Sequence, residues 1–369
     1  MTSKTTPQLV RALANIRQDV QSMHAYAVQD ARGQLKLDAM ENPFSLPEPL
    51  QAALGQRLGS LAINRYPGER IHDLKAALAH HAGLPEGHAL MLGNGSDELI
   101  SLLALACDVP GATILAPLPG FVMYAMSAQL QGLRFVGVPL TADFELDEAA
   151  MLAAIAEHRP AITYLAYPNN PTANLWSVET IRRLIAAVGE QGGLVVMDEA
   201  YQPFASHSWL SEISAHPEAN AHVLLMRTLS KFGLAGIRLG YMMGRAELIA
   251  EIDKVRPPYN ISVLNCECAL FALEHAEVFA EQAATLRRER GLLLSALRAL
   301  PGVKAWDSDA NMILVRVPDA LKTFEGMRAL GVLIKNVSKM HPLLANCLRL
   351  TVGSADDNAR MLAAFQASL

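Results

Sequence analysis

Between about residues 90 and 245, short apolar runs alternate with stretches of helical periodicity. Four runs, at 161–166, 194–197, 223–226 and 239–243, are predicted to be buried strands. Residues 178–190, between the first two runs, place their apolar side chains on one face of a helix. Strands that alternate with amphipathic helices predict an α/β fold, with a mostly parallel sheet covered by helices on both faces.

The pattern changes toward both ends of the chain. Residues 7–23 are predicted to form one helix, which leads into an irregular arm. A long helical stretch from about 266 to 300 is followed by a strand at 312–317, a helix, a strand at 348–352 and a terminal helix. This order predicts a second, smaller α+β domain near the carboxyl end.

This change of pattern divides the chain into three segments. Residues 1–40 are expected to form an N-terminal arm and part of the small domain. Residues 41–265 are expected to form the large domain, and residues 266–369 the small C-terminal domain.

Composition narrows the class of protein. The chain has 369 residues, 51% of them apolar and 18% charged, which is enough for two globular cores. A net charge of −5 argues against a nucleic-acid-binding protein. The four cysteines show neither a disulfide framework nor metal-ligand spacing, so we expect reduced thiols, a cytoplasmic location and no metal site: Cys107, Cys266, Cys268 and Cys347.

We expect no membrane segment and no signal peptide. The first residues lack the continuous apolar stretch of a secretory signal. Residues 99–116 are apolar enough to raise the question of a membrane span. Asp108, Pro110 and Gly111 divide them into a helix-sized and a strand-sized piece, each too short to cross a bilayer.

Four segments with candidate chemistry come at the places where parallel sheets bind ligands, beyond the carboxyl ends of strands. The first, at 93–98, opens an apolar helix, with Ser96 as the expected N-cap and free amides that favour an anion. The second, at 167–172, is a proline-bounded turn that can aim the amide of Asn170. Taken alone, the first segment is better explained as a plain helix cap, and the second is explained equally well as a plain turn.

The other two segments carry ionisable groups. Asp198 ends a buried strand, where an unpaired carboxylate is costly, and Tyr201 follows three residues later. Lys231 comes between an apolar strand and the glycine-rich turn at 233–238. Poor solvation there lowers the pKa of an amine and makes it available for Schiff-base chemistry.

Asn170, Asp198, Tyr201, Lys231 and Arg238, in this order and spacing, resemble the fold-type I pyridoxal-phosphate-dependent aminotransferases of the aspartate aminotransferase superfamily. The resemblance covers nearly the whole chain. It implies a large domain with a mostly parallel seven-stranded sheet between helices, a smaller α+β domain, and pyridoxal 5′-phosphate as cofactor.

The resemblance also implies roles for individual residues. Lys231 is expected to hold the cofactor as a Schiff base and to carry the proton, and Asp198 to pair with the protonated pyridine nitrogen. Tyr201 and Asn170 are expected to donate to the ring oxygen O3′. Phe121 is expected to stack on the ring. The expected phosphate ligands are Ser96, Asp97, Thr228, Ser230 and Arg238.

Within the superfamily, the segments 37–43, 64–67, 254–260 and 341–353 most resemble histidinol-phosphate aminotransferases. That resemblance implies transfer of an amino group between L-histidinol phosphate and 2-oxoglutarate in histidine biosynthesis. It also implies a homodimer in which Tyr66 reaches the cofactor phosphate of the partner subunit. The residues expected on the substrate side are Arg349, Lys335, Tyr26 and Asn42.

The chain departs from that pattern in four places. Met40 stands where the family usually has asparagine, and Ala173 where glycine normally follows Asn-Pro-Thr. The interval from Lys231 to Arg238 is one residue shorter than in many members. Lys335 stands where many members have a second anion-binding arginine. A lysine offers a point charge in place of a planar guanidinium, which puts the selectivity for phosphate in question.

Three alternatives share part of this evidence. An aminotransferase for aromatic amino acids and a threonine-phosphate decarboxylase would use the same scaffold, the same lysine and the same anion site. A non-catalytic regulator that senses the cofactor would normally carry an added DNA-binding domain, for which the residues before Glu41 are too few and insufficiently basic.

Overall fold

The computed structural model describes residues 6–23 and 29–369. The contacts divide the chain into two units, Met1–Gly33 and Gln34–Leu369. The first unit contains α1 (Pro7–Leu13) and α2 (Gln18–Ser22). The prediction of one helix over 7–23 is therefore wrong. The break comes at Arg17, whose backbone is extended (φ −49°, ψ 135°).

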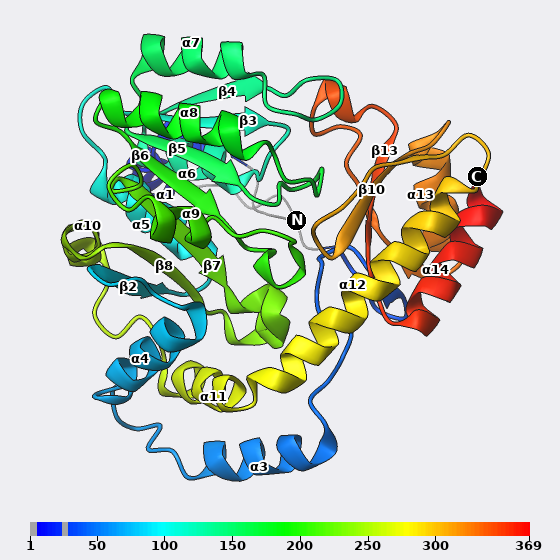
Figure 1. The fold of residues 1–369 in the computed structure, drawn as a ribbon, viewed down its shortest axis with the longest axis horizontal. Helices are drawn as coiled ribbons and strands as arrows, with labels where there is room; N and C mark the ends of the chain where they lie inside the picture. The colour runs from blue at the N-terminus through cyan, green and yellow to red at the C-terminus, as the bar shows by residue number, and fades with distance from the viewer. Residues whose placement is uncertain (1–5, 24–28) are drawn as a thin grey trace. The chain divides into compact units, whose positions relative to one another are not determined.

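A seven-stranded sheet forms the centre of the second unit, and helices lie on its two faces (Figure 1). All neighbouring strands are parallel except at β8, which runs antiparallel to both β2 and β7. The four predicted strands and the mostly parallel sheet are confirmed. In spatial order the strands are β2 (His88–Gly93), β8 (Gly240–Arg245), β7 (Val223–Thr228), β6 (Leu194–Asp198), β5 (Ile162–Ala166), β3 (Thr113–Leu118) and β4 (Arg134–Pro139).

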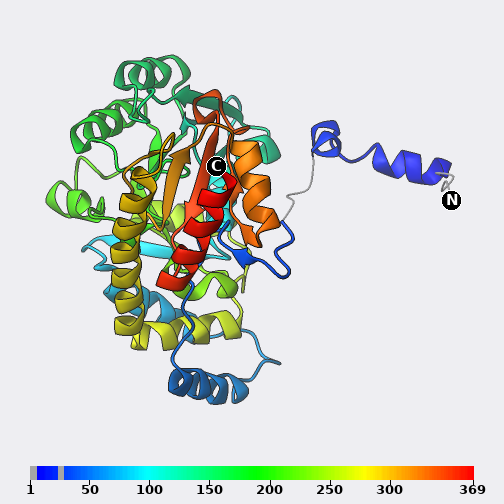
Figure 2. The ribbon, with the colours of Figure 1, turned by 90° about the vertical axis from the view of Figure 1, so that its right-hand side faces the viewer.

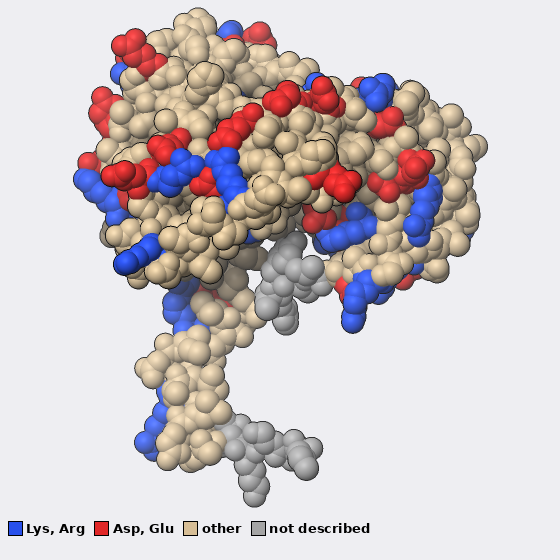
Figure 3. All heavy atoms as spheres, turned by 90° about the horizontal axis from the view of Figure 1, so that it is seen from below, with Lys and Arg blue, Asp and Glu red and all other residues tan. Residues whose placement is uncertain are grey.

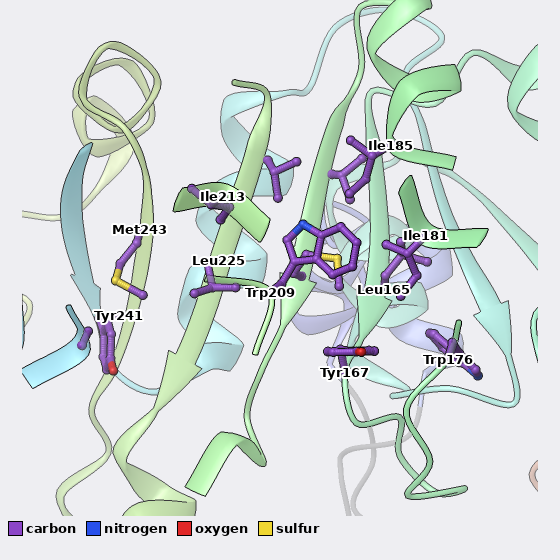
Figure 4. Packing of buried hydrophobic residues seen from close by; sticks show 14 of the residues in the cluster. Leu165, Tyr167, Trp176, Ile181, Ile185, Trp209, Ile213, Leu225, Tyr241 and Met243 are labelled. Atoms are coloured by element: carbon purple, nitrogen blue, oxygen red, sulfur yellow. The ribbon is translucent and has the colours of Figure 1, made fainter. Parts of the chain in front are cut away.

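Alternate side chains of each central strand enter two different apolar cores. On β5, Leu165 belongs to one core cluster and Tyr164 to the other, and both are fully buried. Figure 4 shows the first cluster, in which Trp209 lies among side chains of the strands and of α8 (Val178–Glu190). Helix α8 has the predicted bounds, and Ile181, Leu184, Ile185 and Val188 of its apolar face are buried.

The other helices around this sheet come from the segments between its strands and from those just before β2 and just after β8. They are α4 (Arg70–Ala82), α5 (Ser96–Ala106), α6 (Met123–Gln131), α7 (Glu148–His158), α9 (Leu210–Ala215) and α10 (Ala246–Ile252). Within the described ranges, no helix has the length and apolarity that crossing a membrane requires. Acidic and basic side chains are mixed on the face shown in Figure 3.

A smaller antiparallel sheet follows, in the order β12 (Lys335–Asn336), β13 (Cys347–Thr351), β10 (Met312–Arg316) and β9 (Lys304–Ala305). Figure 2 shows it flanked by α13 (Ala320–Ala329) and α14 (Ala355–Ser368). Beside it, β1 (Leu35–Lys36) pairs with β11 (Val332–Leu333), so the first residues of the second unit join this region.

The predicted long helix over 266–300 is in fact two helices. They are α11 (Val263–Glu274) and α12 (Ala276–Arg298), separated at His275, where the backbone leaves the helical region (φ −120°, ψ 35°). The predicted boundary between residues 265 and 266 falls inside α11. The three-segment division of the chain stays a prediction.

Helix α3 (Glu48–Gly59) has no buried residue, so polar contacts must hold it in place. Arg57 forms ion pairs with Glu267 and Glu274 of α11, and its Nη1 donates to Glu274 Oε2 at 2.5 Å. The Glu267 side chain is only 6% exposed and also pairs with Arg70. Figure 1 shows α3 below α11, and the irregular segment 60–69 continues from it.

We predict that Arg57→Ala loosens α3 while the two sheets stay folded. The substitution leaves the buried Glu267 with one cation fewer, which should cost about 1–2 kcal/mol of local stability. Amide hydrogen exchange within α3 should therefore become about tenfold faster or more. Gln56→Ala, in the same turn and exposed, is the control; equal exchange rates in the two variants would refute the anchoring role.

Candidate active site

A cavity of about 360 Å³ lies beyond the carboxyl ends of β5, β6 and β7. The segments that follow these three strands form most of its wall, and the rest comes from residues 39–41, the start of α5, and Phe121 and Tyr124 after β3. Parallel neighbours end at the same edge of a sheet, which brings the separate motifs together. The predicted residues that line the cavity are Ser96, Asp97, Phe121, Asn170, Asp198, Tyr201, Thr228, Ser230, Lys231 and Arg238.

Asp198 is a buried carboxylate at the end of β6, 4% exposed. Its Oδ2 accepts a hydrogen bond from Tyr124 OH at 2.6 Å, and its Oδ1 accepts one from the Ala200 amide at 3.1 Å. Burial raises the pKa of Asp198 to about 6, although both hydrogen bonds oppose that rise. Among the described residues it forms no salt bridge, so a cationic ligand in the cavity would find a partner here.

Lys231 lies in the turn that follows β7, and its Nζ donates to the Ala39 carbonyl at 2.8 Å. Burial, together with the nearby Arg349 cation, lowers the pKa of Lys231 to about 8. A substantial fraction of the amine is therefore neutral near physiological pH. Gly233, in the same turn, has φ 139°, and an added Cβ would lie 2.7 Å from the Phe279 ring.

A chain of hydrogen bonds connects Arg349 with Tyr201. Arg349 Nη1 donates to Asn170 Oδ1 at 2.7 Å, and Asn170 Nδ2 donates to Tyr201 OH at 3.1 Å. Arg349 Nη2 donates to the Asp38 carbonyl at 2.7 Å. All three side chains are buried, and burial raises the pKa of Tyr201, which keeps its hydroxyl protonated. The chain holds the Asn170 amide and the Tyr201 hydroxyl at the cavity wall.

A cluster of hydroxyl and guanidinium groups lines another part of the cavity. Thr228 Oγ1 lies 3.0 Å from Ser230 Oγ, and Arg238 Nη1 donates to Ser230 Oγ at 3.3 Å. Arg238 also pairs with Asp97 at 3.4 Å. An added Cβ on Gly95 would lie 2.7 Å from the Arg238 guanidinium, so only glycine allows this close approach.

The prediction of Ser96 as the N-cap of α5 is wrong. Gly95, with φ 80°, is the N-cap, and Ser96 is the first residue of the helix. The Ser96 amide is therefore one of the amides at the helix start that have no carbonyl within the helix to bond. Gly240 approaches this amide so closely that an added Cβ would lie 2.7 Å from the Ser96 nitrogen.

These groups match the chemistry of pyridoxal 5′-phosphate. Amides at a helix start, two hydroxyls and a guanidinium are suitable donors for a dianionic phosphate. The buried carboxylate of Asp198 suits a protonated ring nitrogen, and the poorly solvated amine of Lys231 suits an aldehyde. Phe121 is half-buried at the cavity wall, where its ring can cover a flat ligand.

The other predicted residues lie outside this cavity lining or outside the described ranges. Lys335 is the cross-strand neighbour of Arg349, which places the two side chains on one face of the small sheet. Asn42 Nδ2 donates to Gln282 at 2.9 Å. Tyr66 is 76% exposed and stacks on Tyr259, with ring centroids 4.4 Å apart. Tyr26 lies outside the described residues.

Two features of the site were missed from the sequence. One is the bond from Tyr124 to Asp198, for which the helical spacing of Tyr124 from Phe121 was the available signal. The other is the backbone conformation at two positions where the chain departs from the family pattern. Met40 (φ 52°) and Ala173 (φ 65°) both have left-handed backbones, the conformation that asparagine and glycine tolerate best.

Comparisons with known proteins agree over nearly the whole chain. The family model for aminotransferase class I and II matches residues 32–365. The histidinol-phosphate aminotransferase of Acidovorax sp. (strain JS42) is 72% identical over 367 residues, which cover 99% of this chain and 100% of that protein.

Two solved structures share the fold. The histidinol-phosphate aminotransferase of Sinorhizobium meliloti in complex with pyridoxal-5′-phosphate has a TM-score of 0.83 at 24% identity, and the match covers 96% of this chain and 97% of that one. The L-threonine-O-3-phosphate decarboxylase of Porphyromonas gingivalis has a TM-score of 0.74 at 21% identity, with 90% and 98% covered.

We predict that Asp198→Asn stabilises the cofactor-free protein. The pKa of Asp198 is raised from 3.8 to about 6 on folding, so the folded state loses stability as pH rises through this range. Removing the charge should recover about 3 kcal/mol at pH 8 and little at pH 4. Urea unfolding at the two pH values measures the difference.

The matched control for that comparison is Asp143→Asn, because the Asp143 side chain is 83% exposed and its substitution should change little at either pH. If Asp198→Asn lowered the stability at pH 8, the carboxylate would not carry the cost of burial that we assign to it.

Proposed function

The chain belongs to the aminotransferase class I and II family, and on that basis we propose that it exchanges an amino group between L-histidinol phosphate and 2-oxoglutarate. It is a pyridoxal-phosphate-dependent aminotransferase, and its substrates are small molecules. The products are imidazole-acetol phosphate and L-glutamate, and the reaction belongs to L-histidine biosynthesis.

The observation that carries the choice of substrate is the 72% identity, over essentially the full length of both chains, to a histidinol-phosphate aminotransferase. The cavity supports the class of reaction independently. It combines a buried carboxylate without a salt bridge among the described residues, a half-buried amine of lowered pKa, and a cluster of groups that can donate hydrogen bonds to an anion.

When bound, pyridoxal 5′-phosphate supplies an aldehyde that condenses with primary amines and a ring that accepts the electrons left at the substrate Cα. We assign Lys231 Nζ as the amine that holds the aldehyde carbon. The amine of Lys231 would also serve as the base and acid that moves the proton at the substrate Cα. Asp198 would hold the ring nitrogen and keep it protonated.

The remaining cavity residues orient the cofactor. Tyr201 and Asn170 donate to O3′, and Phe121 covers one face of the ring. Their support is the bond between Asn170 and Tyr201 and the position of all three in the cavity wall. We assign the phosphate to donors at one end of the cavity: the backbone amides of Ser96 and Asp97 at the start of α5, and the side chains of Thr228, Ser230 and Arg238.

The substrate's anionic group is assigned to Arg349. Histidinol phosphate has no α-carboxylate and carries a phosphate ester, so the same site must accept a phosphate in one half-reaction and a carboxylate in the other. A planar guanidinium binds either group through two parallel hydrogen bonds. Lys335, which is opposite Arg349 on the neighbouring strand, adds a second positive charge. We also assign Asn42 to the substrate side; Tyr26, expected there from the sequence, lies outside the described residues.

We further propose a homodimer in which Tyr66 contributes to the cofactor-phosphate site of the partner subunit. The support is that Tyr66 is 76% exposed, is stacked on the exposed Tyr259, and is three positions along the chain from the exposed Ile63. Exposed apolar and aromatic side chains gathered in this way are typical of interfaces. A cytoplasmic location is also proposed, because all four cysteines are free thiols.

The rival activities would give different products. The fold is shared with a threonine-phosphate decarboxylase, but at 21% identity that likeness concerns the fold alone. Purified holoenzyme is incubated with L-histidinol phosphate and 2-oxoglutarate, and glutamate is measured. A second reaction contains L-threonine phosphate, and carbon dioxide is measured. A third contains an aromatic amino acid as the amine donor.

We expect glutamate formation from histidinol phosphate at a higher kcat/KM than from an aromatic amino acid. In the same assay, Lys231→Ala should lower kcat by at least a thousandfold, because it removes the group that carries the proton. Carbon dioxide release without glutamate would contradict the aminotransferase assignment. Turnover retained in Lys231→Ala would contradict the role of the lysine alone.

Lys335→Arg should raise kcat/KM for histidinol phosphate by about threefold to tenfold. The planar guanidinium of arginine can form two parallel hydrogen bonds with a phosphate ester, whereas a lysine ammonium acts as a point charge. Lys339→Arg, a nearby exposed lysine, is the control. Equal values in wild type and Lys335→Arg would remove Lys335 from the substrate site.

A further inference from the structure

Tyr124 is the nearest side-chain partner of the Asp198 carboxylate, yet it belongs to none of the motifs discussed above. It comes from the first turn of α6, is 2% exposed, and its hydroxyl lies 2.6 Å from Asp198 Oδ2. Its ring stacks on Tyr164 of β5 at 4.2 Å and 8°, and its edge contacts Phe121 at 5.6 Å and 84°.

We propose that Tyr124 is a positioning residue that keeps the Asp198 carboxylate ionised and correctly oriented for the pyridine nitrogen of the cofactor. This inference rests on the proposed function, because it takes Asp198 as the partner of that nitrogen. Tyr124 acts through Asp198, and we assign it no proton transfer of its own.

The direction of the hydrogen bond follows from the surroundings. Burial, and then the Asp198 charge, raises the pKa of Tyr124 well above its ordinary value, so its hydroxyl stays protonated and donates. The Ala200 amide donates to the other oxygen of Asp198. Two donors favour the ionised carboxylate, whereas burial disfavours it. Removing one donor therefore moves Asp198 toward its neutral form.

The orientation of Tyr124 is fixed by packing. The stack on Tyr164, which is itself fully buried, holds the plane of the Tyr124 ring. The edge contact links Phe121, which is assigned to the face of the cofactor ring, to Tyr124, which holds the Asp198 carboxylate. A shift of α6 would consequently move both cofactor contacts together.

The other ionisable groups around Asp198 do not stabilise its ionised form through a hydrogen bond. Asp97 of α5 and Glu199, the next residue along the chain, are acidic and raise the pKa of Asp198. Tyr201 belongs to the chain of bonds with Asn170. The hydroxyl of Tyr164 is buried and has no hydrogen-bond partner among the described residues. Tyr164 is therefore a matched control for a tyrosine-to-phenylalanine change in the same stack.

The test measures the affinity of cofactor-free protein for pyridoxal 5′-phosphate between pH 5 and pH 9. It compares wild type, Tyr124→Phe and Tyr164→Phe. In Tyr124→Phe the carboxylate should be protonated at higher pH, so binding must first remove that proton. We expect the dissociation constant of Tyr124→Phe, relative to wild type, to grow about tenfold to a hundredfold as pH falls from 9 to 5. The ratio for Tyr164→Phe should stay constant.

Unfolding of the cofactor-free proteins provides a readout that is independent of the cofactor. Because the pKa of a buried carboxylate is raised in the folded state, its cost to stability appears as pH rises. Tyr124→Phe should therefore lower the melting temperature more at pH 8 than at pH 5, whereas any effect of Tyr164→Phe should not depend on pH.

The outcomes separate the two proposals. If the ratio for Tyr124→Phe were independent of pH, or followed that of Tyr164→Phe, the positioning role would be wrong even with a fully active wild type. If wild-type protein failed to bind pyridoxal 5′-phosphate at all, the proposed function would fail, and the unfolding data would still report on the contact between Tyr124 and Asp198.

Discussion

Two ionisable groups share one buried cavity, and the described structure contains no salt bridge between them. Asp198 ends β6, and Lys231 follows the neighbouring strand β7. Burial raises the pKa of the acid to about 6 and lowers the pKa of the amine to about 8. Without a ligand, burying the charge of either group destabilises the fold. With the cofactor bound, the carboxylate can pair with a cationic ring and the amine can react with an aldehyde. The two groups therefore lower the stability of the cofactor-free protein, and cofactor binding relieves that destabilisation.

The fold makes that arrangement possible because it fixes the backbone around both groups. Parallel strands β5, β6 and β7 end at one edge, and each contributes a segment to the cavity. Close backbone approaches at Gly95 and Gly240 bring the start of α5 against the Arg238 guanidinium. Residues 38–40, from far earlier in the chain, accept hydrogen bonds from Arg349, Lys231 and Asn311. The large sheet and the N-terminal arm of the second unit therefore meet at the site.

Much of this could be predicted from the sequence, because the signals were local. Strand β5 is a run of buried apolar residues, and α8 has a regular apolar face, so both were placed well. The breaks at Arg17 and His275 were missed, because neither place carries a proline or glycine to mark it. The partner of Asp198 was missed for a different reason. Tyr124 is 74 residues away in sequence, and only the packing of α6 against the sheet brings it close.

The central claim is that one amine, Lys231, carries the cofactor covalently. Reduction of the holoenzyme with borohydride, followed by proteolysis and mass mapping of the peptides, tests that claim most directly. We predict that the reduced cofactor is found on Lys231 and on no other side chain. A label on any other residue, or no label on a protein that binds the cofactor and turns over, would contradict it.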